Sequence, residues 1–137
     1  MLFDSSALYK RYQLEPGRDQ VLQLGQLADE VVVAAHCRTE IASVLNRQRH
    51  DGFLAEPDYD RMMREVDVEF DDFYIMPLDK RVEAFAIAAM RRARLRAMDA
   101  LHIGTAMAVG IDLFVTADKR QAQVAQMVGL TTELIAA

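Results

Sequence analysis

The sequence contains a single cysteine, Cys37, which excludes a disulfide bond within the chain. A lone cysteine is typical of proteins in a reducing compartment, so we expect the protein to be cytoplasmic. The first ten residues carry an acid at position 4 and no apolar core region, which argues against a secretory signal peptide. No uncharged apolar run approaches the roughly 18 residues that a membrane span needs, so we expect no membrane association.

The chain also lacks an excess of positive charge. Its 16 Lys and Arg residues are outnumbered by 21 Asp and Glu residues, which gives a net charge of −5. The protein as a whole is therefore not a general nucleic-acid binder. An enzyme that acts on nucleic acid through an acidic, metal-holding site with a local basic rim is compatible with this charge. The phosphate-binding patterns G-x-x-x-x-G-K-[ST] and G-x-G-x-x-G are both missing.

Short apolar segments alternate with longer amphipathic ones along the 137 residues, without a repeat or a linker. Such alternation predicts an α/β fold in which a small parallel β-sheet is flanked by helices. A chain of this length suits a single domain, residues 1–137, around one core. We expect strands at 1–3, 31–35, 73–77, 112–118 and, more weakly, 130–134. We expect helices at 5–12, up to about 28, and at 36–50, 57–72, 79–94, 97–110 and 119–128.

Acidic residues follow two of the predicted strands. Asp4 comes directly after the first strand, and Asp118 ends the segment 112–118. Ligands bind at the carboxyl ends of parallel strands, so both acids should lie on one rim of the sheet, beside helix N-termini. Taken alone, each acid is better explained as a simple helix cap.

Two further acids border apolar helix faces. Glu40 lies one turn before Val44 and next to a stripe that includes Cys37 and Ile41. Asp99 opens the apolar helix 97–110, where an unpaired buried carboxylate would be among the most costly groups in the fold. Either Asp99 caps its helix, or a positive charge compensates it.

Four carboxylates on one rim would repel each other. Each pair about 4 Å apart costs about 1 kcal/mol in water and about 4 kcal/mol at an effective dielectric of 20. A divalent cation would remove this conflict, and ligands that are all oxygen favour Mg²⁺ or Mn²⁺ over Zn²⁺. We therefore predict a catalytic, metal-holding site, with Mg²⁺ as the cofactor and Mn²⁺ able to replace it, formed by Asp4, Glu40, Asp99 and Asp118.

The ordered segments DSSALYK, RTEIASVL, RAMDALHIGTA and FVTADKR resemble the PIN domain family, and most of all the VapC-type toxins of bacterial and archaeal toxin–antitoxin pairs. The resemblance covers essentially the whole chain. It implies a PIN-like fold and a metal-dependent endoribonuclease, the toxin of a type II pair, which cleaves RNA with water activated by the metal. It further implies a cognate antitoxin as partner, and a homodimer.

The same resemblance assigns roles to individual residues. The four acids match the acidic cluster of the family, and Ser6 and Thr116 match its supporting hydroxyls. Many relatives carry a further acid or amide after the last aspartate, whereas Lys119 and Arg120 follow here. The number of metal ions, one or two, therefore stays open.

Basic residues offer candidate contacts for an RNA backbone. The segment RRARLR concentrates four arginines ahead of Asp99, at positions Arg91, Arg92, Arg94 and Arg96. They form either a phosphate-binding rim or a solvated helix C-terminus, where cations suit the helix dipole. Lys10 lies one turn beyond Ser6 and could reach a phosphate or remain a surface lysine.

The remaining polar candidates have simpler interpretations. We expect His102 to be a core or supporting residue, because no second histidine accompanies it at helical spacing. We expect His36 and His50 to face solvent or lie near helix ends. Cys37 is most simply a small buried hydrophobe.

Three other function classes are alternatives to a nuclease. An aspartyl-phosphate phosphatase needs a second acid two residues after the first, where Ser6 stands. A phospho-receiver needs a lysine well beyond the last strand, whereas Lys119 directly follows Asp118. The alternative that remains is a non-catalytic PIN-like module that binds RNA or protein, although such a module should have lost at least one of the four acids.

Overall fold

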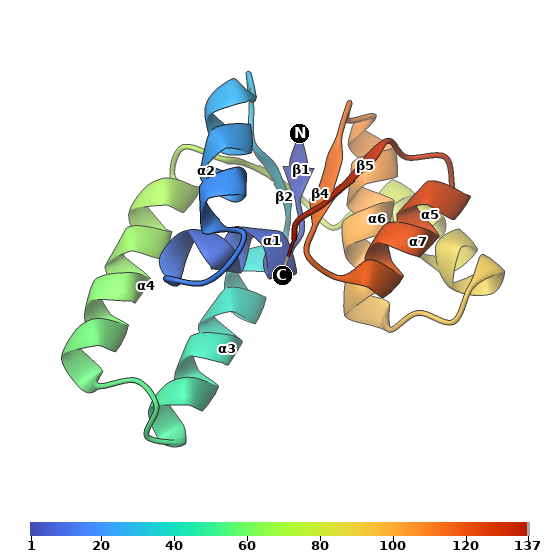
Figure 1. The fold of residues 1–137 in the computed structure, drawn as a ribbon. Coiled ribbons are helices and arrows are strands. Elements are labelled where there is room, and N and C mark those ends of the chain that lie inside the picture. The colour runs from blue at the N-terminus through green and yellow to red at the C-terminus, as the bar shows by residue number, and fades with distance from the viewer. Residues whose placement is uncertain (137) are drawn as a thin grey trace.

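A computed structural model describes residues 1–136. Five parallel strands form one sheet in the order β3-β2-β1-β4-β5, with helices on both faces (Figure 1). The predicted fold class is confirmed. The strands are β1 (Leu2–Phe3), β2 (Val32–Ala34), β3 (Tyr74–Met76), β4 (Phe114–Thr116) and β5 (Thr132–Leu134). They are shorter than the apolar segments that predicted them by one to four residues.

The helices coincide with the predicted segments to within about two residues at most ends. They are α1 (Ser5–Leu8), the 3-10 helix η1 (Tyr9–Tyr12), α2 (Arg18–Leu27), α3 (Cys37–His50), α4 (Glu56–Phe70), α5 (Lys80–Arg92), α6 (Ala97–Val109) and α7 (Lys119–Met127). The segment 5–12, predicted as one helix, thus divides into α1 and η1. None of the helices within residues 1–136 is both long enough and apolar enough to cross a membrane.

The sheet separates two hydrophobic clusters, because successive strand residues point to opposite faces. One face of the sheet packs against α1, α2, α3 and α4, through Phe3, Val33 and Val115. The other face packs against α5, α6 and α7, through Leu2, Val32 and Phe114. The two helical layers lie on opposite sides of the strands in Figure 1. Any site at the carboxyl edge of the sheet therefore receives residues from both layers.

Helices α5 and α6 approach each other so closely that their backbones touch at Gly104. A Cβ atom built on Gly104 would lie 2.5 Å from the Val82 carbonyl oxygen and 2.8 Å from the Ala86 nitrogen. Only glycine fits this contact without moving one helix away from the other. The contact fixes the position of α6, whose first turn carries Asp99.

Candidate active site

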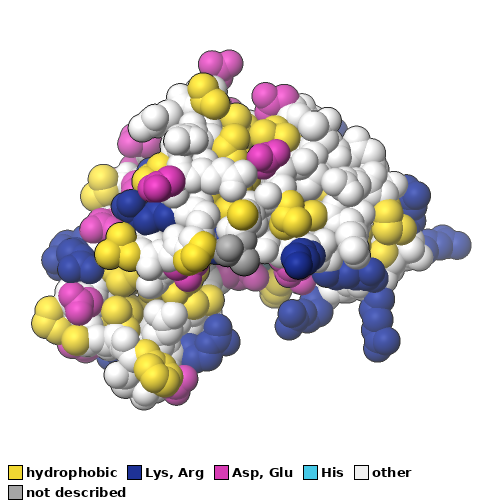
Figure 2. All heavy atoms as spheres, in the orientation of Figure 1, with side chains coloured by type: hydrophobic (Ala, Val, Ile, Leu, Met, Phe, Trp, Pro, Cys, Tyr) yellow, Lys and Arg dark blue, Asp and Glu magenta, His cyan; other side chains and the backbone are white. Residues whose placement is uncertain are grey.

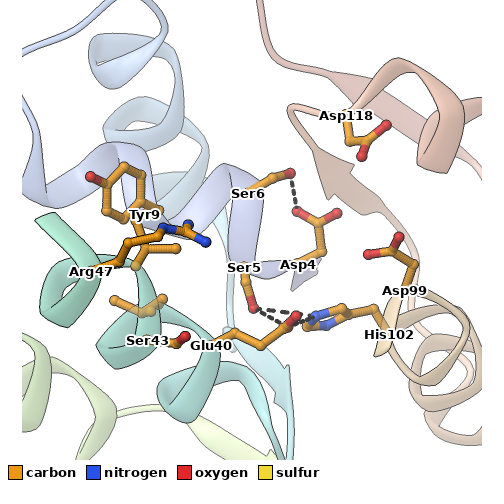
Figure 3. A pocket seen from close by; sticks show the side chains of 12 residues that line it. Asp4, Ser5, Ser6, Tyr9, Glu40, Ser43, Arg47, Asp99, His102 and Asp118 are labelled. Carbon is orange, nitrogen blue, oxygen red and sulfur yellow. Dashed lines mark hydrogen bonds and ion pairs between the residues drawn. The ribbon is translucent and has the colours of Figure 1, made fainter. Parts of the chain in front are cut away.

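Four acids from four different segments line one pocket between the helical layers (Figure 3). Asp4 and Asp118 follow β1 and β4, and each caps the helix that comes next. The prediction that these two lie on one rim beside helix N-termini is therefore confirmed. Glu40 and Asp99 lie in the first turns of α3 and α6. The pocket has a volume of about 340 Å³, and its other lining residues are Ser5, Ser6, Tyr9, Ile41, Ser43, Val44, Arg47 and His102.

Asp4 is held rigidly at the end of β1. Its side chain is buried, and Oδ1 accepts hydrogen bonds from Ser6 Oγ at 2.7 Å and from the Ala7 backbone N–H at 3.0 Å. Its Oδ2 accepts a hydrogen bond from Thr116 Oγ1. Burial raises the pKa of Asp4, although the charge of His102 and these hydrogen bonds oppose that effect. The two hydroxyls that the family resemblance singled out thus orient this carboxylate.

Asp99 and Asp118 make fewer contacts than Asp4 that would compensate their negative charge. Burial, followed by the negative charge of Asp118, raises the pKa of Asp99. The nearest cation to Asp99 is Arg96, whose Nε lies 3.9 Å from Oδ2 and whose side chain is 91% exposed. Asp118 Oδ1 accepts from the Arg120 and Gln121 backbone N–H groups at the start of α7. Both carboxylates therefore retain free lone pairs that face the pocket.

Helix α7 also fixes where Asp99 lies. The buried side chain of Gln121 donates a hydrogen bond from Nε2 to the Asp99 backbone carbonyl at 2.8 Å. This bond ties the first turn of α6 to the first turn of α7. It brings Asp99 and Asp118, which are 19 residues apart in the sequence (118 − 99), to the same rim of the sheet.

Glu40 points into a small polar cluster on the floor of the pocket (Figure 3). Its Oε1 accepts a hydrogen bond from Ser5 Oγ at 2.7 Å and lies 2.6 Å from His102 Nε2 and 3.3 Å from His36 Nε2. Burial alone would raise the pKa of Glu40. The hydrogen bond and charge of His102, together with the contacts to Ser5 and His36, instead hold that pKa below its ordinary value.

The surroundings of the two histidines beside Glu40 were predicted from the sequence to different extents. His102 is buried against Glu40, as expected for a core or supporting residue. His36 is indeed at a helix end, but it packs against the His102 ring with the centroids 4.3 Å apart, and its Nε2 lies 2.9 Å from the Met98 carbonyl oxygen. The i,i+4 spacing of His36 and Glu40 was the available signal for this contact. Ser5 was missed as a partner of Glu40 because its position suited a simple helix cap.

Cys37 is buried below this cluster, as predicted. Its burial raises the pKa of the thiol to about 12, so the group stays protonated at neutral pH. A protonated, inaccessible thiol is a poor nucleophile, which leaves Cys37 with a packing role.

The predicted RNA contacts separate into two groups. Arg94 and Arg96 line a second hollow that adjoins the acidic pocket and that also includes Asp99, Asp118 and Arg120. In Figure 2, dark blue side chains lie on both sides of the notch at the lower edge of the molecule, between the two helical layers. By contrast, the last turn of α5 carries two exposed arginines that line neither hollow, Arg91 and Arg92. Their positions fit the solvated helix C-terminus better than the phosphate-binding rim.

Lys10 and Arg47 differ in whether they reach the acidic pocket. Lys10 Nζ bonds to Glu15 at 3.4 Å and to the Pro16 carbonyl at 2.9 Å, and the residue does not line the acidic pocket. We therefore remove Lys10 from the candidate substrate contacts. Arg47, which the sequence analysis missed, extends from α3 along the wall opposite Asp99 and Asp118 (Figure 3).

The donor set of the acidic pocket fits a hard divalent cation. Asp4, Asp99 and Asp118 supply carboxylate oxygens, and their neighbours in the pocket are hydroxyl groups rather than thiolates. Mg²⁺ and Mn²⁺ bind oxygen ligands of this kind, and one such ion would offset the repulsion that raises the pKa of Asp99.

Comparison with known proteins places this arrangement in a family. A model of the PIN domain matches residues 1–127 of the chain. The chain belongs to the PIN domain family. Among curated proteins, none is detectably similar in sequence. The predicted family is thus confirmed by a match that includes all four acids.

Solved structures of other PIN proteins share this fold at low sequence identity. FitAcB from Neisseria gonorrhoeae is 15% identical with a TM-score of 0.73, covering 96% of this chain and 94% of its own. VapBC2 from Rickettsia felis, solved with a promoter DNA fragment, is 10% identical with a TM-score of 0.72 over 98% of each chain. VapC20 from Mycobacterium tuberculosis, described as a toxin that cleaves the sarcin–ricin loop, is 13% identical with a TM-score of 0.70 over 95% of each chain.

Proposed function

We propose that this PIN domain is a Mg²⁺-dependent endoribonuclease, with Mn²⁺ able to replace Mg²⁺, and that it is the toxin of a type II toxin–antitoxin pair. The observation that carries the proposal is the convergence of Asp4, Glu40, Asp99 and Asp118 from four segments on one open pocket. Helix capping after parallel strands accounts for Asp4 and Asp118 but not for Glu40 and Asp99, which cap no helix. The similarity of the fold to VapC20, a toxin that cleaves an RNA loop, supports RNA as the substrate class.

In this proposal each pocket residue has a role that follows from its position. Asp4, Asp99 and Asp118 hold the ion, and Glu40 faces it from α3 across the pocket. When bound, Mg²⁺ would lower the pKa of a water molecule and would neutralise negative charge on the phosphate. Ser6 and Thr116 keep the Asp4 carboxylate in a single orientation.

The arginines around the pocket would hold the RNA strand. Arg94 and Arg96 lie beside Asp99 and Asp118, and Arg47 lies on the opposite wall. A strand bound between these two walls would place one phosphate over the carboxylates. Arginine suits this role because its guanidinium group binds phosphate oxygens bidentately.

The proposed partners are an antitoxin and a second copy of the chain. A solved toxin–antitoxin complex from Klebsiella pneumoniae contains a chain with this fold, at 14% identity and a TM-score of 0.64, which supports a cognate antitoxin that blocks the pocket. The homodimer follows from the family resemblance. Sizing with light scattering on the isolated chain tests the dimer, and co-purification with the product of a neighbouring short gene tests the antitoxin.

The purified protein should cleave structured RNA in Mg²⁺ or Mn²⁺ and stop when EDTA is added. Readdition of Mg²⁺ should restore cleavage, because the ion is held by side chains that remain in place. Gel analysis of end-labelled RNA measures the rate, and a preparation of the Asp4→Ala variant controls for contaminating nucleases. Cleavage that continues at full rate in EDTA would refute the metal-dependent mechanism.

Replacing Arg94 and Arg96 together with glutamine should weaken RNA binding and flatten its salt dependence. Each lost phosphate contact lowers the slope of log K against log salt by about 0.7 for single strands, so the double variant should lose about 1.4. The matched control is Arg61→Gln with Arg64→Gln on α4, which line a separate hollow without aspartate. Fluorescence anisotropy with labelled RNA, in EDTA, measures both slopes. Equal slopes for the two double variants would contradict the phosphate-binding role.

A further inference from the structure

Three metal-ligating atoms converge on the floor of the pocket, beside the cluster of aspartates. They are His36 Nε2, Glu40 Oε1 and His102 Nε2, and all three lie within 4.8 Å of one another. The Glu40 oxygen is 3.3 Å from His36 Nε2 and 2.6 Å from His102 Nε2. Two imidazoles and one carboxylate therefore point at a common centre.

This donor set differs chemically from the aspartates around it. Imidazole nitrogen binds borderline transition-metal ions such as Zn²⁺ well, whereas Mg²⁺ prefers oxygen. In tetrahedral Zn²⁺ sites, bonds of about 2.0–2.1 Å place neighbouring ligand atoms about 3.3 Å apart. The His36–Glu40 separation already has this value. The His102–Glu40 pair must open by less than about 1 Å, which Glu40 allows because its side chain is 29% exposed.

The protein positions the three ligands before any ion arrives. His36 and Glu40 are one turn apart on the same face of the α3 N-terminus, and His102 comes from α6 in the opposite layer. Ser5 Oγ lies 3.2 Å from His102 Nε2, and the pocket beyond it has room for a water as the fourth ligand. The set of two histidines and one carboxylate with an open position is a known form of Zn²⁺ coordination.

Binding requires a change in the proton on each ring. Both Nε2 atoms must present a lone pair to the ion, so the proton on each ring has to be carried by Nδ1. Within residues 1–136, the buried Nδ1 of His102 has no hydrogen-bond partner. A proton on Nδ1 therefore gains no bond there, and moving it from Nε2 ends the hydrogen bond that Nε2 of His102 donates to Glu40 and the one that Nε2 of His36 donates to the Met98 carbonyl. We therefore expect affinity below that of structural zinc sites, in which this second nitrogen is paired.

We propose that His36, Glu40 and His102 bind a borderline transition-metal ion, with Zn²⁺ as the representative, at a site separate from the three aspartates that hold Mg²⁺. Glu40 also belongs to the acidic cluster that faces Mg²⁺, and it can serve only one of the two ions at a time. Zn²⁺ at this site therefore withdraws Glu40 from the acidic cluster and inhibits RNA cleavage. The inhibition rests on the proposed nuclease function, whereas the binding site does not.

The binding test uses the full chain without a histidine tag and compares two histidines of α3. Isothermal titration with Zn²⁺ in Mg²⁺-free buffer should give one ion per chain for the wild type and for His50→Gln, since His50 lies exposed at the far end of the helix. His36→Gln should weaken Zn²⁺ binding by about 100-fold. Losing a group that only orients a metal ligand already costs about 10- to 100-fold in affinity, and His36 would be a ligand itself. Co²⁺ should give the intense visible absorption of a tetrahedral site in the wild type and lose it in His36→Gln.

A second measurement separates this inference from the nuclease proposal. With Mg²⁺ in excess, Zn²⁺ should slow RNA cleavage by wild type and His50→Gln, while His36→Gln keeps its own zinc-free rate. Equal Zn²⁺ affinity in His36→Gln and wild type would overturn the site and place the ion among the aspartates. Zn²⁺ binding that depends on His36 but leaves the cleavage rate unchanged would overturn the inhibition. A protein that cleaves no RNA in Mg²⁺ yet shows His36-dependent binding would refute the nuclease and retain the zinc site.

Discussion

Asp99→Asn should raise the melting temperature of the metal-free protein while lowering RNA cleavage by about 1000-fold. The loss of activity follows from removing a ligand of an ion that contributes several kcal/mol of transition-state stabilisation. The gain in stability follows from removing a charge that Asp118 repels. A pair of charges about 4 Å apart in water corresponds to about 1 kcal/mol, or roughly 3 °C for a domain of this size.

The size of the stability effect should change with pH. Burial and the charge of Asp118 raise the folded-state pKa of Asp99 above its ordinary 3.8. A raised pKa contributes stability that is fully present below the unfolded value and is lost as pH rises through the folded value. The advantage of the asparagine variant should therefore be large at pH 7 and shrink as the pH falls toward 4. Thermal melts in EDTA across this range measure it.

Mg²⁺ should reverse the ranking of the two proteins. An ion at 100 times its dissociation constant stabilises the wild type by about 2.7 kcal/mol, and the asparagine variant should gain much less. Asp79→Asn is the matched control, because Asp79 also opens a helix but caps Val82 outside the pocket. Asparagine caps helices as well as aspartate does, so this control should be close to neutral and keep the Mg²⁺ response. An Asp99→Asn variant that melts below wild type, with no Mg²⁺ response in either, would identify Asp99 as a structural acid that holds no ion.

Gly104→Ala should destabilise the protein by about 3 kcal/mol, even though alanine favours helices over glycine by about 1 kcal/mol at exposed positions. The added Cβ meets backbone atoms of Val82 and Ala86, and backbone can yield only if α5 and α6 move apart. Such a movement opens the second hydrophobic cluster and displaces Asp99. Urea unfolding followed by circular dichroism measures the loss.

Gly25→Ala on α2 provides the comparison for this prediction. A Cβ at Gly25 meets only the end of the Arg11 side chain, at 3.0 Å, which is flexible. We expect this variant to be neutral or slightly more stable than wild type. Equal stability of the two alanine variants would show that α5 and α6 are not tightly packed at Gly104.

The acidic rim was predictable because the features that mark each acid lie close to it in the sequence. Asp4 and Asp118 each follow an apolar strand segment, and parallel strands bring such positions to one edge. Glu40 and Asp99 were identified because each interrupts an apolar helix face. In these cases a short window of sequence contains both the residue and the feature that makes it unusual.

The floor of the pocket was not predictable in the same way. His102 meets Glu40 across 62 residues of sequence and from the opposite helical layer, so no window contains both. The position of Lys10 was left open by the sequence because its partner, the Pro16 carbonyl, is a backbone atom that no side-chain pattern specifies. The length over which two strands pair depends on where the neighbouring strand ends, and this is also a property of the assembled sheet.

The Thr116–Asp4 hydrogen bond has a consequence for the synthesis of the chain. It joins atoms 112 residues apart, and β1 pairs with β4 along the same path. A nascent chain that has not yet released β4 therefore leaves Asp4 without this partner and the pocket without Asp118. The site that we propose cleaves RNA is therefore completed only after β4 and Asp118 have left the ribosome and β4 has paired with β1. A nascent chain that is shorter than this carries an incomplete acidic site.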